Sequence, residues 1–162
     1  MKNQRFYPLE ILLWCIAMPG FGQFLNRKWI KGIVFILLEF LINVNSKLNL
    51  FIKYSFQGKA ETAIYAADFE WMLFYPCVYI FSMFDGYIDA LKISGQQRPP
   101  LLSIPFLTAA YLSTVSVIYS DKEWLYTYIP PVFIPIIGII AGFILGGFVR
   151  NILLARELKE LA

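Results

Sequence analysis

The sequence predicts an all-α integral membrane protein, a helical bundle with four transmembrane helices. Hydrophobic residues make up 59% of the 162 residues and charged residues only 15%, against roughly 45–50% and about 25% in soluble domains. Long stretches of the chain also carry no charge. A soluble domain of this composition would expose apolar patches large enough to aggregate, so the apolar excess is expected to face lipid. The length is that of one domain.

The first apolar segment, 8–25, is expected to form a short helix and a glycine turn. Its apolar run stops at Pro19-Gly20, after fewer than the roughly 20 residues needed to cross about 30 Å of hydrocarbon. We therefore predict that this segment re-enters the membrane or lies in the interface, with a full crossing as the alternative.

Four later segments are predicted to span the membrane. Segments 101–119 and 131–149 contain no charged residue, and 71–93 is long enough to span and rich in aromatic residues. Segment 29–44 is shorter and ends in polar residues. The polar region 45–70 is long for a connection, so we expect an interfacial helix within this extracytoplasmic loop.

The tail, residues 150–162, is predicted to be a cytoplasmic amphipathic helix that continues the last span. Leu154, Leu158 and Leu161 recur there at helical spacing among charged residues. Such a helix would anchor the chain at the interface or dock a partner.

Basic residues predict the orientation. Lysine and arginine gather before 29–44, between 71–93 and 101–119, and after 131–149. Four spans place these three clusters on one side, which the positive-inside rule makes the cytoplasm. The protein is thus expected to be a multi-pass protein of the plasma membrane with a cytoplasmic C-terminus.

One motif adds a family resemblance. The stretch 19–27 reads PGFGQFLNR and is followed by Lys31-Gly32. It resembles the P-G-x-G-Q…K-G pattern of small bacterial multi-pass membrane proteins related to the two-transmembrane-domain family, and FDGYIDA at 84–90 is similar to the aspartate-bearing end of that family's second span. The resemblance covers residues 8–95 and implies a membrane hairpin with its glycine turn at the cytoplasmic face. The family has no common catalytic activity, and the long insertion and the two C-terminal spans depart from it.

The motif also has a physical interpretation. Gly20 and Gly22 permit a sharp turn and close backbone approach, while Gln23 and Asn26 would satisfy backbone groups that the turn frees. The basic residues that follow would contact anionic lipid headgroups. We interpret the motif as a structural turn, with a substrate- or partner-binding turn as the alternative. The candidate turn residues are Pro19, Gly20, Gly22, Gln23, Lys31 and Gly32.

Glu39 and Asn43 are the first candidate functional polar residues. Glu39 lies about 15 Å beyond Trp29 along a helix, near the middle of a bilayer, where a charge costs about 2.5–3.5 kcal/mol. It is therefore expected to be neutral, paired or facing a cavity, and Asn43, one turn further on, could share a hydrogen bond with it. Alternatively the helix ends near Asn43 and Glu39 lies close to the outer headgroups.

Asp85 and Asp89 are the second pair of candidates. Their i, i+4 spacing puts both carboxylates on one face near the cytoplasmic end of 71–93. They could bind a cation or relay protons. We favour the alternative that they form structural ion pairs with a basic residue, either Lys92 on the same helix or Arg27 or Lys31 elsewhere.

Gly138, Gly142 and Gly146 form a stripe at four-residue spacing in the last span. A stripe of small residues lets another helix approach closely in lipid. We expect it to mediate packing within the chain, with self-association as the alternative.

The sequence favours a function without catalysis. Histidine is absent, the two cysteines lie far apart in apolar runs, and no nucleophile–base pair, phosphate loop or metal-ligand cluster is present. The small, dispersed net charge of +3 gives no footprint for nucleic acid. We expect a non-enzymatic accessory, assembly or interaction component of a bacterial plasma membrane, without cofactor or metal. Its partners would be anionic lipid headgroups and a second copy or another membrane protein. The alternative is a small transporter or channel subunit for a cation, proton or small solute, and a membrane-embedded enzyme ranks third.

Overall fold

The fold is built from α-helices in the part of the chain that the structure describes, which confirms the all-α prediction. This computed structural model describes residues 6–160, with side chains for all of them except 158 and 160. The helices are α1 (Pro8–Ala17), α2 (Phe21–Leu25), α3 (Trp29–Ser46), α4 (Leu48–Phe56), α5 (Ala60–Ala66), α6 (Phe69–Met72), α7 (Phe74–Ile93), α8 (Ser103–Tyr119), α9 (Glu123–Tyr126) and α10 (Phe133–Glu160).

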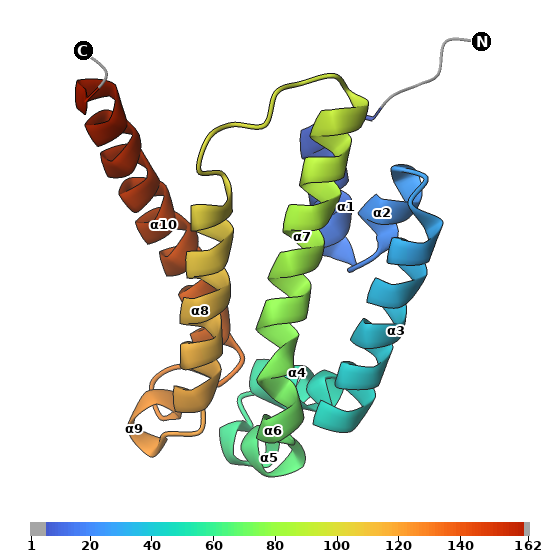
Figure 1. Cartoon of the computed structure of the whole chain (residues 1–162). Coiled ribbons are helices and arrows are strands. Elements are labelled where there is room, and N and C mark those ends of the chain that lie inside the picture. The colour runs from blue at the N-terminus through green and yellow to red at the C-terminus, as the bar shows by residue number, and fades with distance from the viewer. Residues whose placement is uncertain (1–5, 161–162) are drawn as a thin grey trace.

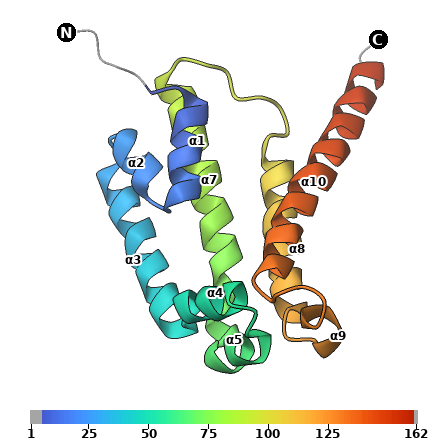
Figure 2. The same cartoon turned by 180° about the vertical axis from the view of Figure 1, so that it is seen from behind.

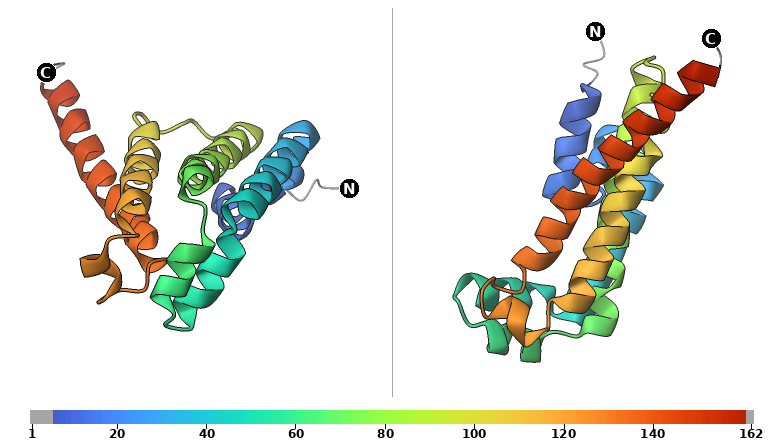
Figure 3. Two further views of the ribbon diagram at one scale, coloured as in Figure 1. Left: turned by 90° about the horizontal axis from the view of Figure 1, so that it is seen from below. Right: turned by 90° about the vertical axis from the view of Figure 1, so that its left-hand side faces the viewer.

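The long helices form two groups that lie side by side (Figure 1). In one group α3 runs along α7, with the short α1 and α2 beside them; in the other α8 pairs with α10. The connection 94–102 joins the groups at the end where α1 begins. The opposite end carries α4, α5, α6 and α9, as the reverse view also shows (Figure 2). Seen from below, the same division holds (left panel of Figure 3).

Proline fixes where several helices begin. Pro8 is the first residue of α1, and Pro76, Pro105 and Pro135 are each the third residue of their helix. The first turn of a helix has no internal acceptor for its N–H groups, so a residue without an N–H costs little there. Pro76 also divides the expected span 71–93. Because its nitrogen cannot donate to the preceding turn, α6 ends at Met72 and α7 begins at Phe74.

Two of the long helices meet the length and composition of a membrane span. These are α3 and the part of α10 from Phe133 to residue 157. The expected span 29–44 continues to Ser46, and the expected loop 45–70 is largely helical because α4 and α5 fill it. The last span and the tail form one uninterrupted helix as far as Glu160. The side chain of Leu158 and all of Leu161, which the tail prediction also used, lie outside the described residues.

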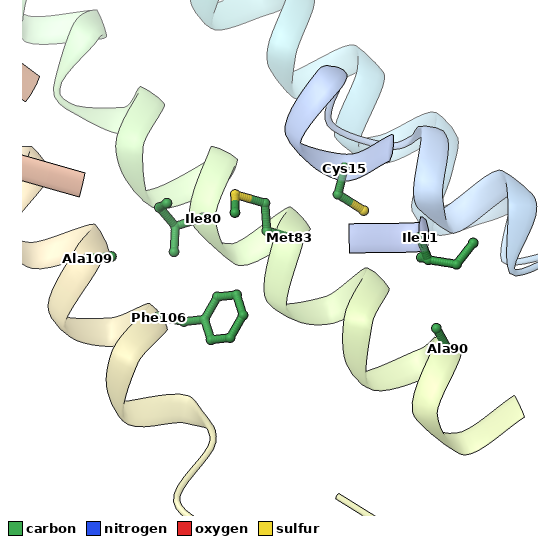
Figure 4. Close-up of a cluster of buried hydrophobic side chains, with 7 residues drawn as sticks. All are labelled: Ile11, Cys15, Ile80, Met83, Ala90, Phe106 and Ala109. Atoms are coloured by element: carbon green, nitrogen blue, oxygen red, sulfur yellow. The ribbon is translucent and has the colours of Figure 1, made fainter. Parts of the chain in front are cut away.

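The apolar core has two parts. The first joins α1, α7 and α8 through Ile11, Cys15, Ile80, Met83, Ala90, Phe106 and Ala109 (Figure 4). Figure 4 shows Cys15 and Ile11 on α1 facing α7, and Phe106 extending from α8 toward the same helix. The second lies at the α4–α6 end and consists of Leu48, Phe51, Ala63, Met72, Val117 and Val132. The two cysteines are free thiols, Cys15 buried and Cys77 exposed.

The glycine stripe packs within the chain. A Cβ at Gly138 would lie 2.9 Å from Leu112 O, one at Gly142 2.8 Å from Thr108 O, and one at Gly146 2.6 Å from Pro105 Cα. All these atoms belong to α8, so the absence of side chains is what lets α10 lie directly against α8. α8 covers the face of α10 that carries the stripe, so a second copy has no room to pack there.

Candidate functional site

The motif turn reverses the chain beside α7. α1 ends at Ala17, and Gly20 adopts a φ of 97°, in the left-handed region that favours glycine. A Cβ at Gly20 would also lie 2.6 Å from Gly32 O at the start of α3. Two independent constraints therefore require glycine at position 20. The turn brings α2 back toward the end of the molecule at which α1 began (Figure 1).

Small residues let α1, α2 and α7 touch. A Cβ at Gly22 would lie 2.8 Å from Ile11 O and would collide with Cys15 Sγ. A Cβ at Gly86 of α7 would lie 2.5 Å from the same sulfur. The thiol of Cys15 thus fills a space between two glycines, and the close approach carries the neighbouring amide side chains onto α7.

Gln23 and Asn26 bind the backbone of α7. Gln23 is fully buried, and its Nε2 donates to Ser82 O at 2.8 Å and to Asp85 Oδ2 at 3.3 Å. Asn26 Nδ2 donates to Gly86 O at 2.8 Å. The sequence suggested that these amides serve the turn itself, but they reach a helix about sixty residues away. The expectation was wrong because a turn packed on a glycine of another helix presents its side chains to that helix.

Lys31 completes the contact with α7. Its Nζ donates to Asp85 Oδ1 at 2.6 Å and to Asp89 Oδ2 at 2.7 Å. The lysine side chain is 43% exposed, whereas the side chains of Asp85 and Asp89 are 17% and 9% exposed. Of the basic residues that the sequence offered as partners, Lys31 is the one that the structure pairs with both carboxylates. We call Gln23, Asn26, Lys31, Asp85 and Asp89 the polar junction.

The polar junction is suited to holding helices together. Its single lysine and two carboxylates leave one negative charge, and buried amides supply further donors. Exposed ion pairs contribute little, about 0–1 kcal/mol, but a buried donor or acceptor left without its partner costs about 1–3 kcal/mol. The buried amides and the largely buried carboxylates both depend on their partners, so the amides and Lys31 all contribute to the junction. Because both aspartates already have a cation, the geometry gives little support to their use in proton relay.

Glu39 lies elsewhere, beside a cavity of about 290 Å³ between the two helix groups. Its Oε2 is buried and has no hydrogen-bond partner among the residues that the structure describes. Tyr75 and Tyr79 line the same cavity, and their rings stack with centroids 5.6 Å apart. Asn43, the expected companion of Glu39, donates to Asn49 Oδ1 at 3.3 Å. Asp85 and Asp89 are not among the residues that line this cavity, so the candidate carboxylates occupy two separate sites.

Comparison with known proteins adds no relative. No protein-family model, no curated protein sequence and no solved structure matches the chain. Among the side chains that the structure describes, no group of three or more Cys, Asp or Glu is placed to hold a metal ion. The candidate sites are therefore judged on their own geometry: a polar junction that ties α2 and α3 to α7, and a cavity that contains one carboxyl group.

Proposed function

We propose that the chain crosses the membrane four times, through α3, α7, α8 and α10. At 1.5 Å per residue, the 20 residues of α7 and the 17 of α8 extend about 30 Å and about 26 Å, and about 17–25 residues suffice for a span. Large apolar side chains on the outside of the long helices support this. They include Ile30, Phe40, Phe81, Leu107 and Ile144, each more than half exposed.

The proposed orientation puts the polar junction near the cytoplasm. Arg27, Lys28, Arg98 and Arg150 belong to segments at the end of the molecule where α1 begins, and an excess of basic residues is typical of the cytoplasmic side. The segment 8–25 then enters from the cytoplasm and returns to it. The resemblance to small bacterial multi-pass proteins favours a bacterial plasma membrane.

Cysteine accessibility tests this topology. In the Cys15→Ala, Cys77→Ala background, a cysteine at Glu10 should react with a membrane-impermeant maleimide only after the membrane is opened, and one at Lys53 in intact cells. Equal reactivity of the two positions in intact cells would contradict the four-span arrangement.

We further propose that the protein is a non-enzymatic accessory component that binds a second membrane protein or a second copy through the end of α10. The observation that supports this proposal is that α10 extends beyond its contact with the connection 94–102. Arg150 Nε donates to Pro100 O at 2.9 Å, after which Ile152 and Leu153 are exposed together with Arg156 and Glu157. A helix in a folded protein gains most of its stability from packing of its apolar side chains, so a partner is expected to cover Ile152 and Leu153.

Photo-crosslinking in native membranes tests the interaction. A photoreactive residue at Ile152 should give a protein adduct of defined mass, at twice 18.7 kDa for a second copy and at another mass for a different protein. The matched control is Ile144 on the same helix, which is 70% exposed and expected to face lipid. Recovery of monomer and lipid adducts alone from Ile152 would refute the proposed interaction.

A small transporter or channel subunit is the second candidate, and Glu39 is the observation that favours it. The polar junction offers no comparable support, because its carboxylates are already paired. A solute-handling function would therefore depend on the cavity beside Glu39.

A further inference from the structure

The cavity beside Glu39 is bordered by several elements. Its walls come from the end of α1, from α3 and α4, from α7, and from α8 and α10 of the other helix group. Most of the lining side chains are apolar, among them Phe51, Val117 and Ile139. Small-molecule sites have this character: mostly apolar walls, about 300–1,000 Å³ in volume, with a few polar groups that orient the ligand. The volume of about 290 Å³ lies just below that range, so the cavity suits a small ligand.

The polar groups of the cavity specify the charge of its occupant. The hydroxyl of Tyr79 donates to Ile16 O at 2.6 Å, and Ser113 Oγ donates to Pro135 O at 3.3 Å. Both side chains therefore already have partners.

In contrast, the buried Oε2 of Glu39 has no hydrogen-bond partner among the described residues. The hydroxyl of Tyr75 and the amide of Asn43 lie next to the Glu39 carboxyl, and neither satisfies its Oε2. Because the terminal torsion of a glutamate is broad, the carboxyl can rotate to present this oxygen to the cavity.

A cation with N–H groups fits these surroundings. Glu39 is only partly buried, but its Oε2 is buried without a partner. A buried polar atom is costly without a donor, and a charge-assisted hydrogen bond from an ammonium group would supply one. The stacked rings of Tyr75 and Tyr79 add aromatic faces, which attract cations. An anionic ligand would be repelled by the carboxylate, and a purely apolar ligand would leave Oε2 without a partner.

We propose that this cavity binds the ammonium group of a small amphiphile, with Glu39 as its counter-ion and the apolar walls around its hydrocarbon part. The site is independent of the interaction proposed for α10. A free amine or the ethanolamine headgroup of a lipid would present the same chemistry.

Equilibrium binding of radiolabelled octylamine to the full chain in dodecyl maltoside at neutral pH tests the proposal. Octylamine is protonated under these conditions, and the detergent contains no amine. We expect saturable binding that Glu39→Gln weakens by about tenfold or more, the effect of losing a hydrogen bond to a charged group. The matched control is Glu10→Gln, which removes the same charge from an exposed residue at the start of α1 and should leave binding unchanged.

Two further comparisons make the result decisive. Octanol, of equal chain length but uncharged, should displace octylamine at least about tenfold less well than unlabelled octylamine; this comparison uses the wild-type chain and holds even if Glu39→Gln fails to fold. Short-chain phosphatidylethanolamine, but not phosphatidylglycerol, should compete if the natural source is a lipid headgroup, whereas a free amine is the source if neither competes. Equal displacement by octanol, or unchanged octylamine binding by a folded Glu39→Gln variant, would overturn the proposal.

Discussion

Replacing Gln23 by alanine should destabilise the protein more than any surface substitution of the same kind. Gln23 is fully buried, and its amide donates to Ser82 O and Asp85 Oδ2. It also accepts a weak hydrogen bond from Cys15 Sγ at 3.7 Å. Alanine would remove all three contacts and leave a small void between α2 and α7.

The expected magnitude follows from these contacts. Side-chain hydrogen bonds between helices average about 0.6 kcal/mol in membrane proteins, and hydrogen bonds to charged groups reach about 1.5–3 kcal/mol. Together with the void, the loss should lower the free energy of unfolding by about 2–3 kcal/mol. Gln23→Glu should cost at least as much, because it keeps the shape of the side chain but places an acceptor against Ser82 O and a second carboxylate beside Asp85.

Unfolding in mixed detergent micelles, followed by far-ultraviolet circular dichroism, measures this difference. The control is Gln96→Ala, an exposed glutamine in the connection between α7 and α8, which should stay within about 0.5 kcal/mol of wild type. If Gln23→Ala were equally neutral, the polar junction would not hold α2 on α7, and its interpretation as a structural lock would fail.

Three further predictions concern the other features of the fold. Gly142→Ala should separate α10 from α8 and lower the thermal midpoint of unfolding, because its Cβ would meet the α8 backbone. Gly147→Ala, with open space around it, should be neutral or slightly stabilising. Similar midpoints for the two variants would contradict the close packing of α10 on α8. Lys31→Met should cost about 1–3 kcal/mol, because it leaves two largely buried carboxylates without their cation. The loss should shrink as salt screens their repulsion, and a salt-independent loss would point to packing alone. If the protein is a transporter subunit, vesicles reconstituted with it should show a solute or proton flux that Glu39→Gln abolishes and Glu10→Gln preserves, and flux retained in Glu39→Gln would exclude that carboxyl.

The sequence by itself determined the all-α class and the approximate positions of the long helices, but not all of their limits: α7 begins at Phe74 rather than at 71, and α4 and α5 lie within the expected loop 45–70. Long segments rich in apolar residues and prolines near their beginnings indicate α7 and α8, and Pro19-Gly20 marks the reversal after α1. These features are local: a proline restricts its own turn, and a glycine with a φ of 97° is needed wherever the chain bends in that way. The i, i+4 spacing of Asp85 and Asp89 likewise placed both carboxylates on one face of a helix.

Only the tertiary structure decided which helix each polar or small side chain meets. The contacts of the polar junction join residues 54 to 62 positions apart, and no local pattern distinguishes Lys31 from Arg27 or Lys92 as the partner of the aspartates. The amides of Gln23 and Asn26 bind α7, and the glycine stripe packs on α8. These contacts could not be read from one segment, because close approach depends on the shapes of both helices that meet. Glu39 could be recognised from the sequence as an unusual charge in an apolar helix. That it borders a cavity, with one oxygen still unpaired, follows from how the two helix groups pack against each other.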